Sequence, residues 1–209
     1  MTSADTPRPP ADPLTPGPGT ACPAGTTGCA PRPLLFLDVD GPIVPFGATS
    51  RELPGGYPTY PVADAARQAA GAHPLLARID PAIGRRLAAL PCVLVWATTW
   101  MADANECVAP QLGLPELPVV SWPEPSDGDG RDGLHWKTRT LTALAAGRPF
   151  VWVDDEITDR DRAWVADHHR GRALLHRVDP RRGLTDPDLA AVESWLREIG
   201  RTAPPPGAG

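Results

Sequence analysis

The sequence has no apolar run of the length that a membrane-spanning helix requires, about 20 residues, and this excludes an integral membrane protein. Its N-terminus lacks the basic segment and the following apolar stretch of a secretory signal, so we expect a cytoplasmic protein. Positive charge is in deficit, because the formal net charge is −5. A protein of this charge does not neutralise nucleic-acid phosphates over a broad surface, although a local basic surface is compatible with it.

Cysteine is scarce, and its spacing carries no metal signature. None of the four cysteines belongs to a CxxC pair, and no histidine pairs with them at zinc spacing. Cys22 and Cys29 are close enough in sequence for a disulfide, but a reducing cytoplasm favours free thiols. A structural zinc site is therefore not expected.

Lysine is almost absent, since Lys137 is the single lysine among the 20 lysine and arginine residues. A site that needs a compact ammonium group on a flexible stem does not accept arginine instead, so this lysine is a candidate functional residue. Chance explains a single lysine equally well when its position alone is considered.

Proline and glycine dominate the two ends of the chain. Residues 1–33 hold nine prolines and four glycines with almost no large apolar side chains, and residues 203–209 are similar. Such segments bury too little apolar surface to offset their ordering entropy. We predict a disordered proline-rich tail at 1–33, a folded domain at 34–202 and a disordered C-terminus at 203–209.

Within the folded region, apolar runs of strand length alternate with amphipathic segments. The predicted strands lie at 34–37, 92–99, 117–122, 150–153 and 173–178, and the predicted helices at 81–90, 101–112, 135–146, 159–168 and 186–199, with a weaker helix at 62–73. Strands separated by helices indicate a parallel sheet with helices on both faces, a three-layer, Rossmann-like α/β sandwich.

Reactive side chains follow three of these strands. In chain order they are Asp38 and Asp40 in LLFLDVDGPIV, Thr98 and Thr99, and Asp154 and Asp155, with Lys137 opening the helix before the last pair. The carboxyl ends of parallel strands share one edge of the sheet, so these groups are predicted to meet in one crevice. Clustered carboxylates repel one another unless a cation holds them, and an oxygen-rich cluster suits Mg²⁺. Hydroxyl and ammonium donors for phosphate, together with a nucleophilic carboxylate, predict phosphoryl transfer.

Each of these features has a simpler structural explanation when it is taken alone. An aspartate pair after a strand is commonly a turn or a helix cap, and Thr98 fits a helix N-cap. The loop at 42–61 is either a flap beside the site or an ordinary surface loop, and Glu156, which has no evident partner, is expected to be solvated. The ordered set of reactive residues at one sheet edge favours the functional interpretation.

With these features in this order, the sequence resembles the haloacid dehalogenase (HAD)-like hydrolases. The resemblance is carried by DVDG after an apolar strand, a threonine after the second strand, the single lysine, and WVDDE after a later strand. It covers nearly the whole folded region. The chain looks like the small, capless actinobacterial proteins of this superfamily and, less closely, like the phosphatase domains of nucleic-acid end-repair enzymes.

The resemblance implies an HAD-like fold and a Mg²⁺-dependent phosphatase that works through an aspartyl-phosphate. It implies that Asp38 is the nucleophile and Asp40 the general acid and base. Lys137 would neutralise the nucleophile and bind the phosphate together with Thr98 and Thr99. The implied magnesium ligands are Asp38, the Val39 backbone carbonyl, Asp40, Asp154 and Asp155, with Asp155 preferred as the direct ligand of the last pair.

The spacing leaves little room for a large cap domain, because only 51 residues separate Asp40 from the predicted strand at 92–99. An open site suits a large phosphorylated substrate, either a nucleic-acid end or a protein. Two alternatives stay open: a catalytically idle HAD-like binding or regulatory module, and a phosphotransferase with an acceptor other than water. The paired Asp38 and Asp40 favour an enzyme, because an idle module has no need of the second acid. The sequence does not indicate an oligomeric state.

Overall fold

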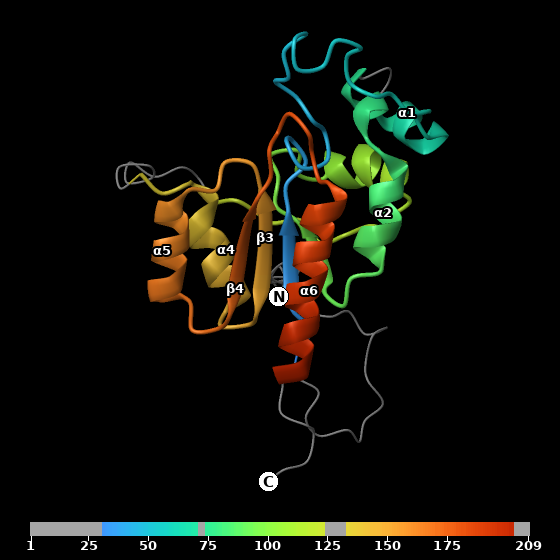
Figure 1. Cartoon of the computed structure of the whole chain (residues 1–209). Helices are drawn as coiled ribbons and strands as arrows, with labels where there is room; N and C mark the ends of the chain where they lie inside the picture. Colours follow the sequence, from blue (N-terminus) through green and yellow to red (C-terminus); the bar gives the residue numbers. More distant parts are fainter. Residues whose placement is uncertain (1–30, 71–73, 124–132, 203–209) are drawn as a thin grey trace, which may run out of the picture.

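Four short apolar strands form a parallel sheet in the computed structural model, which describes residues 31–70, 74–123 and 133–202 (Figure 1). The strand order is β2-β1-β3-β4, and the strands are β1 (Leu34–Leu37), β2 (Val93–Trp96), β3 (Phe150–Asp154) and β4 (Ala173–Arg177). The central strand β1 pairs on both sides, with Leu37 opposite Trp96 and Val153. Both of its faces are buried, which explains why its sequence is continuously apolar.

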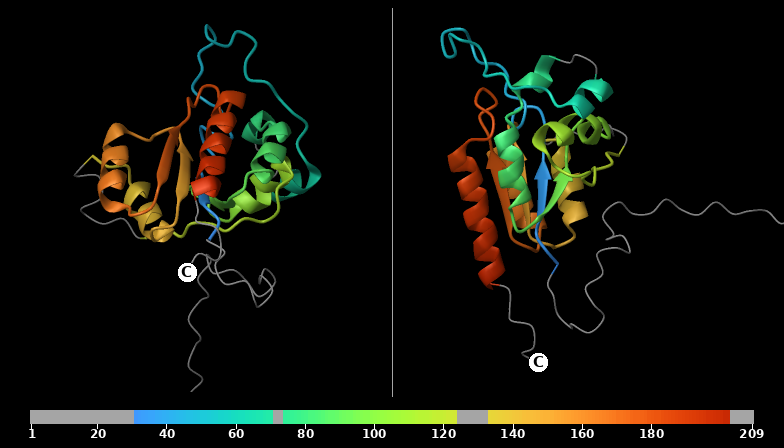
Figure 2. Two further views of the ribbon diagram at one scale, coloured as in Figure 1. Left: turned by 60° about the horizontal axis from the view of Figure 1, so that its bottom comes forward. Right: turned by 90° about the vertical axis from the view of Figure 1, so that its right-hand side faces the viewer.

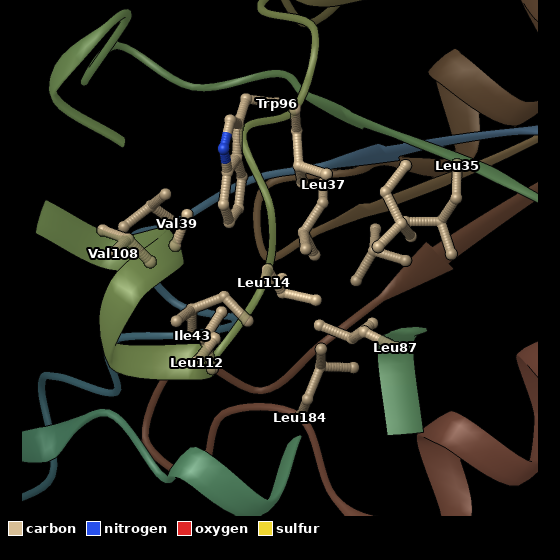
Figure 3. Close-up of a cluster of buried hydrophobic side chains, with 14 of the residues drawn as sticks. Leu35, Leu37, Val39, Ile43, Leu87, Trp96, Val108, Leu112, Leu114 and Leu184 are labelled. Carbon is tan, nitrogen blue, oxygen red and sulfur yellow. The ribbon is translucent and has the colours of Figure 1, made fainter. Parts of the chain in front are cut away.

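Alternation along β1 divides the core into two layers. Leu35 and Leu37 point into one hydrophobic cluster, whereas Leu34 and Phe36 point into the other. The first layer contains α1 (Asp64–Ala70), the 3-10 helix η1 (Pro74–Arg78), α2 (Pro81–Ala88), the π-helix η2 (Ala104–Val108), α3 (Ala109–Leu112) and α6 (Asp186–Thr202). The second layer contains α4 (Lys137–Ala145) and α5 (Asp159–His168). The fold is therefore the predicted three-layer α/β sandwich, and Figure 3 shows part of the larger cluster.

Most of the predicted helices are confirmed with small shifts at their ends. Asp80 caps α2 as predicted, because its side chain accepts a 2.8 Å hydrogen bond from the Ala82 amide. The helix predicted at 159–168 matches α5, which begins with a capping box between Thr158 and Asp161. The weak helix predicted at 62–73 is confirmed as α1, and its last residues, 71–73, lie outside the described part of the chain. The 3-10 helix η1 was not predicted.

The strand predicted at 117–122 is wrong. This segment forms only an isolated bridge between Val119 and Trp96 at the edge of the sheet. The Pro118 carbonyl accepts from the Trp96 amide and the Val120 amide donates to the Trp96 carbonyl, each at 2.8 Å. Proline has no amide hydrogen, so Pro118 cannot extend the ladder.

The helix predicted at 101–112 is shorter and less regular than expected. It begins at Ala104 with the π-helix η2 and continues as α3 to Leu112, where Gly113 adopts φ 67°. Pro110 lies inside this helical stretch, and its ring conflicts with the carbonyl of the preceding turn of a regular α-helix. A wider turn before the proline accommodates this conflict.

The strands end at one edge of the sheet, and residues 45–60 extend beyond that edge (Figures 1 and 2).

No helix within residues 31–70, 74–123 and 133–202 is long and apolar enough to cross a membrane. Cys92 and Cys107 are buried free thiols. Cys22, Cys29 and the predicted C-terminal tail lie outside the described residues, as does most of the predicted N-terminal tail, so the domain bounds stay a prediction.

Candidate active site

The ammonium group of Lys137 lies between two carboxylates from different strands. Its Nζ atom is 2.8 Å from Oδ2 of Asp38 and 2.8 Å from Oδ2 of Asp154. All three side chains are buried. Burial alone would lower the pKa of Lys137, but the charges of Asp38 and Asp154 raise it above its ordinary value. The single lysine of the chain is therefore a buried cation at the predicted crevice.

The sheet register brings these residues together. Asp38 follows β1, and its amide donates a 3.1 Å hydrogen bond to the Val153 carbonyl, which places it beside Asp154 at the end of β3. Burial raises the pKa of Asp38 to about 7; the Lys137 charge opposes this shift and the Asp154 charge adds to it. A pKa this high means that the environment penalises the charged form of the carboxylate. A further cation nearby would stabilise that charged form.

Asp155 completes a cluster of three carboxylates. One ligand oxygen from each of Asp38, Asp154 and Asp155 lies within 4.8 Å of the others. Burial raises the pKa of Asp155 to about 6, with the Asp154 charge as the next cause. Arg177 fixes the main chain here, since its Nε donates a 2.8 Å hydrogen bond to the Asp155 carbonyl.

The two aspartates of the last pair differ in how many donors they already bind. Asp154 accepts hydrogen bonds from Lys137, from the Trp152 indole at 3.2 Å and from the Glu156 amide at 2.9 Å. Its carboxylate is thus committed to positioning Lys137. Asp155 lies against Gly41 instead, because a Cβ atom at Gly41 would be 2.6 Å from its carboxylate. This difference favours Asp155 as the direct metal ligand.

A tight turn after β1 presents Asp40 at the same edge. The Val39 carbonyl accepts hydrogen bonds from the amides of Ile43 and Val44, both at 2.9 Å. Gly41 adopts φ 85°, a left-handed conformation that favours glycine. The predicted role of the Val39 carbonyl as a metal ligand is disfavoured, because two hydrogen bonds of the turn already occupy that oxygen and the Val39 side chain is buried in the core.

The two predicted phosphate-binding threonines lie in different environments. Thr98 is fully buried, and its hydroxyl accepts a 3.3 Å hydrogen bond from the Trp100 amide. This contact belongs to the turn that follows β2. The helical stretch begins only at Ala104, so Thr98 is not the helix N-cap that its sequence position also allowed. Thr99 is exposed. Both follow β2, next to β1, and their role toward phosphate stays a prediction.

Comparison with known proteins identifies the family of the chain. Residues 34–189 match the family described as "HAD domain in Swiss Army Knife RNA repair proteins". The chain belongs to this family. A solved structure, the HAD domain of the effector protein Lem4 from Legionella pneumophila, covers 83% of this chain and 96% of its own at 11% identity and a TM-score of 0.44. No curated protein matches the chain.

Trp100 is a residue of this HAD domain that the sequence did not point to. Its indole Nε1 donates a 2.9 Å hydrogen bond to Oδ2 of Asp40 across 60 residues of sequence. The bond fixes the position of the predicted acid and base. The only available signal was that Trp100 follows the candidate threonines directly.

Asp161 was also missed, and it anchors the start of α4 where Lys137 lies. Its carboxylate accepts from the His135 amide at 2.8 Å and from the Thr138 hydroxyl at 2.6 Å, and it also binds both the amide and the hydroxyl of Thr158. Burial would raise the pKa of Asp161, but the hydrogen bonds from Thr138 and Thr158 bring it below its ordinary value. The capping pattern from Thr158 to Asp161 was the signal that could have revealed it.

A second group with metal-ligand chemistry lies beside the first. It comprises His135, Asp154 and Glu156, and His135 Nε2 is 3.0 Å from Glu156 Oε2. Glu156 therefore has a partner, contrary to expectation, but its side chain is 68% exposed, so its expected solvated position is confirmed. The other imidazole nitrogen, Nδ1, accepts a 3.2 Å hydrogen bond from the Lys137 amide, so His135 helps to hold the start of α4.

Proposed function

We propose that this HAD domain is a Mg²⁺-dependent phosphomonoesterase that acts through an aspartyl-phosphate on Asp38. The observation that carries the proposal is the position of Asp38 at a sheet edge, with the Lys137 ammonium at 2.8 Å and two further carboxylates in the same cluster. The neighbouring Asp40, held by Trp100, supports an enzyme rather than an idle binding module. Action in the cytoplasm stays a prediction from the sequence.

The donor set fits a magnesium ion. Three carboxylates meet within 4.8 Å, and two of them have raised pKa values because burial and mutual repulsion penalise their charges. Hard oxygen ligands of this kind suit Mg²⁺, which keeps some of its waters and contacts a substrate phosphate. Asp38 and Asp155 would hold the ion, with Asp40 contributing from the turn. When bound, Mg²⁺ supplies positive charge that offsets the charge of the phosphoryl group.

The first chemical step would use the two acids of the DVDG turn. A carboxylate oxygen of Asp38 attacks phosphorus, and the bond between phosphorus and the ester oxygen breaks. Asp40 donates its proton to the departing alkoxide. Lys137 offsets the negative charge around the nucleophile, and Thr98 with Thr99 would donate hydrogen bonds to phosphate oxygens.

The second step would return the enzyme to its starting state. Asp40, now deprotonated, accepts a proton from a water molecule as that water attacks phosphorus. The bond between Asp38 and phosphorus breaks, and inorganic phosphate leaves. If a hydroxyl group of another molecule attacked in place of water, the domain would be a phosphotransferase. Product analysis distinguishes the two, because transfer gives a phosphorylated acceptor instead of inorganic phosphate.

The substrate class follows from the openness of the site and from the family. The described residues contain no separate cap domain, so a phosphate at the end of a large molecule has access to the sheet edge. The family is described by its presence in RNA repair proteins, so we propose a terminal phosphate of a nucleic-acid strand as the substrate. A phosphorylated protein is the second candidate that an open site admits.

The test is hydrolysis of p-nitrophenyl phosphate with Mg²⁺ and with excess chelator, using wild type, Asp38→Asn and Asp40→Asn. We expect metal-dependent turnover that both variants abolish or reduce by at least about a hundredfold. Asp159→Asn is the matched control, because this aspartate is fully exposed at the start of α5. Turnover without metal, or turnover unchanged in Asp38→Asn, would refute the mechanism. Inactivity toward a broad panel of phosphate esters would favour the binding module.

A further inference from the structure

Three tryptophans contact or directly precede residues of the proposed phosphate site. Trp100 donates to Asp40, Trp122 donates from Nε1 to the Thr98 carbonyl at 3.1 Å, and Trp136 directly precedes Lys137. Two of these indoles donate a hydrogen bond to a predicted catalytic or phosphate-binding residue, and the third belongs to the sequence neighbour of Lys137. The phosphoryl chemistry assigned above uses only the first of these contacts.

Trp136 is the most exposed of these indoles. Its exposed fraction is 43%, and within the described residues the other large hydrophobic side chains in this class are Phe46 at 40% and Met101 at 39%. An exposed tryptophan leaves a large apolar surface in water, and aromatic side chains of this kind are frequent in binding sites. Its neighbour in sequence, Lys137, is almost completely buried.

Trp136 is also held in place. The ring of Trp122 packs against it edge to face, with centroids 4.6 Å apart and an interplanar angle of 69°. Trp122 is fixed in turn by its hydrogen bond to Thr98. An aromatic side chain that is ordered before binding loses little conformational entropy when a ligand packs on it.

The indole of Trp136 lies next to the catalytic centre. Its ring centroid is 5.5 Å from Nζ of Lys137, the same atom that contacts Asp38 at 2.8 Å. A phosphoryl group bound at Asp38 would therefore have an aromatic surface beside it. The chemical group that accompanies a terminal phosphate and has an aromatic face is a nucleobase, and bases stack on tryptophan with little dependence on sequence.

We propose that Trp136, supported by Trp122, is a nucleobase-binding residue that stacks on the base of the phosphate-bearing terminal nucleotide of an RNA strand. This inference rests on the proposed function, and it names the part of the substrate that the site recognises besides phosphate. Stacking on one base at the strand end does not require a large basic surface that neutralises many phosphates. A protein with a net negative charge could therefore bind an RNA end in this way.

The kinetic test compares two substrates that differ by one base. Short RNA strands with a 5′- or a 3′-phosphate are assayed with Mg²⁺ beside identical strands in which the phosphate-bearing residue is abasic. We expect wild type to prefer the strand with the base by about tenfold in kcat/KM, and Trp136→Ala to lose that preference. Trp136→Phe should retain most of it. Trp164→Ala, which removes a partly buried tryptophan of α5, is the matched control and should keep the preference of wild type.

A binding measurement separates this inference from the proposed hydrolysis. Anisotropy of fluorescently labelled strands is recorded with the full chain in chelator, so that no turnover is needed. We expect wild type to bind the base-containing strand more tightly than the abasic strand and Trp136→Ala to bind both equally; Trp136→Leu serves if the alanine variant does not fold. Absence of phosphate release together with this binding pattern would overturn the proposed hydrolysis alone. Equal binding of both strands by wild type, or an undiminished preference in Trp136→Ala, would overturn the role of Trp136 and favour a phosphorylated protein as substrate.

Discussion

A Cβ atom at Gly41 would lie 2.6 Å from the carboxylate of Asp155. The turn after β1 and the end of β3 therefore touch through a position where only glycine fits. The same glycine adopts φ 85°, so conformation and contact both require it. The close approach places Asp155 against the DVDG turn, and a carboxylate oxygen of Asp155 lies within 4.8 Å of one from Asp38.

Replacing Gly41 with alanine should disrupt the acidic cluster. We expect Gly41→Ala to lose activity by at least about a hundredfold and to unfold at a lower temperature, since a side chain there displaces Asp155 and adds the cost of a left-handed residue, roughly 1–2 kcal/mol. Gly47→Ala is the matched control, because Gly47 has φ 79° but a Cβ atom at this position would meet nothing within 4 Å. The control should lose stability and keep activity. Equal activity losses in the two variants would contradict the importance of the contact with Asp155.

Magnesium should stabilise the folded protein through Asp155. A ligand present at a hundredfold excess over its Kd stabilises by about 2.7 kcal/mol, so Mg²⁺ is expected to raise the Tm of wild type. Asp155→Asn should abolish this rise. Glu156→Gln should preserve it, because Glu156 belongs to the second group with His135 rather than to the cluster with Asp38. A Mg²⁺ response lost in Glu156→Gln and kept in Asp155→Asn would move the metal site to the second group.

Magnesium affinity should depend on pH. The pKa of Asp38 is about 7 and that of Asp155 about 6, both above the ordinary 3.8, so protons compete with the metal over this range. Affinity is expected to rise from pH 5 to pH 7.5, with release of protons that calorimetry in two buffers of different ionisation enthalpy detects. Binding without any proton release at pH 6 would contradict the raised pKa values.

The same two groups predict the direction of the stability change in chelator. Between pH 4 and pH 7, Asp38 and Asp155 hold more protons in the folded chain than in the unfolded chain, because their folded pKa values are raised. The contribution of these two groups to the free energy of unfolding should therefore fall as the pH rises through this window. Urea unfolding at pH 5.5 and pH 7.5 measures the change, and Asp38→Asn should reduce the difference.

Replacing Asn105 should lower the free energy of unfolding by more than replacing a partly exposed asparagine usually does. Its Oδ1 accepts from the Trp96 indole and from the Leu117 amide, both at 2.9 Å, and its Nδ2 donates to the Leu117 carbonyl at 2.8 Å. Asn105→Ala leaves these groups without their partner, and we expect a loss of about 3 kcal/mol in urea unfolding. The exposed neighbour Glu106 provides the control, since Glu106→Gln should change stability by less than about 0.5 kcal/mol. A loss no larger than that of the control would show that these three hydrogen bonds are dispensable.

The site residues that directly follow a strand could be predicted from the sequence. The apolar run before Asp38 and the run before Asp154 predict neighbouring parallel strands, and the fold confirms that the two aspartates meet. Lys137 stood out because no other lysine exists in the chain. In each case the evidence was local. The pattern of apolar residues and the residue types within a short segment predict where a strand ends or a helix begins.

Contacts between segments that are distant in the sequence could not be predicted from such local patterns. The bond from Trp100 to Asp40 depends on how the chain turns after β2, and no short pattern encodes that path. The interval at 117–122 has the composition of a strand, yet Pro118 limits it to one bridge and Asn105 holds it through side-chain hydrogen bonds. The occupied Val39 carbonyl follows from turn geometry, which a resemblance to a family does not specify.

The position of Lys137 has a practical consequence for chemical labelling. Lys137 is the single lysine of the chain, and its amine is buried between two carboxylates. A reagent that acylates amines would find this lysine enclosed by the two carboxylates, so Lys137 should react slowly in the folded protein. Any acylation of Lys137 would then measure the fraction of molecules in which the crevice around it has opened to solvent.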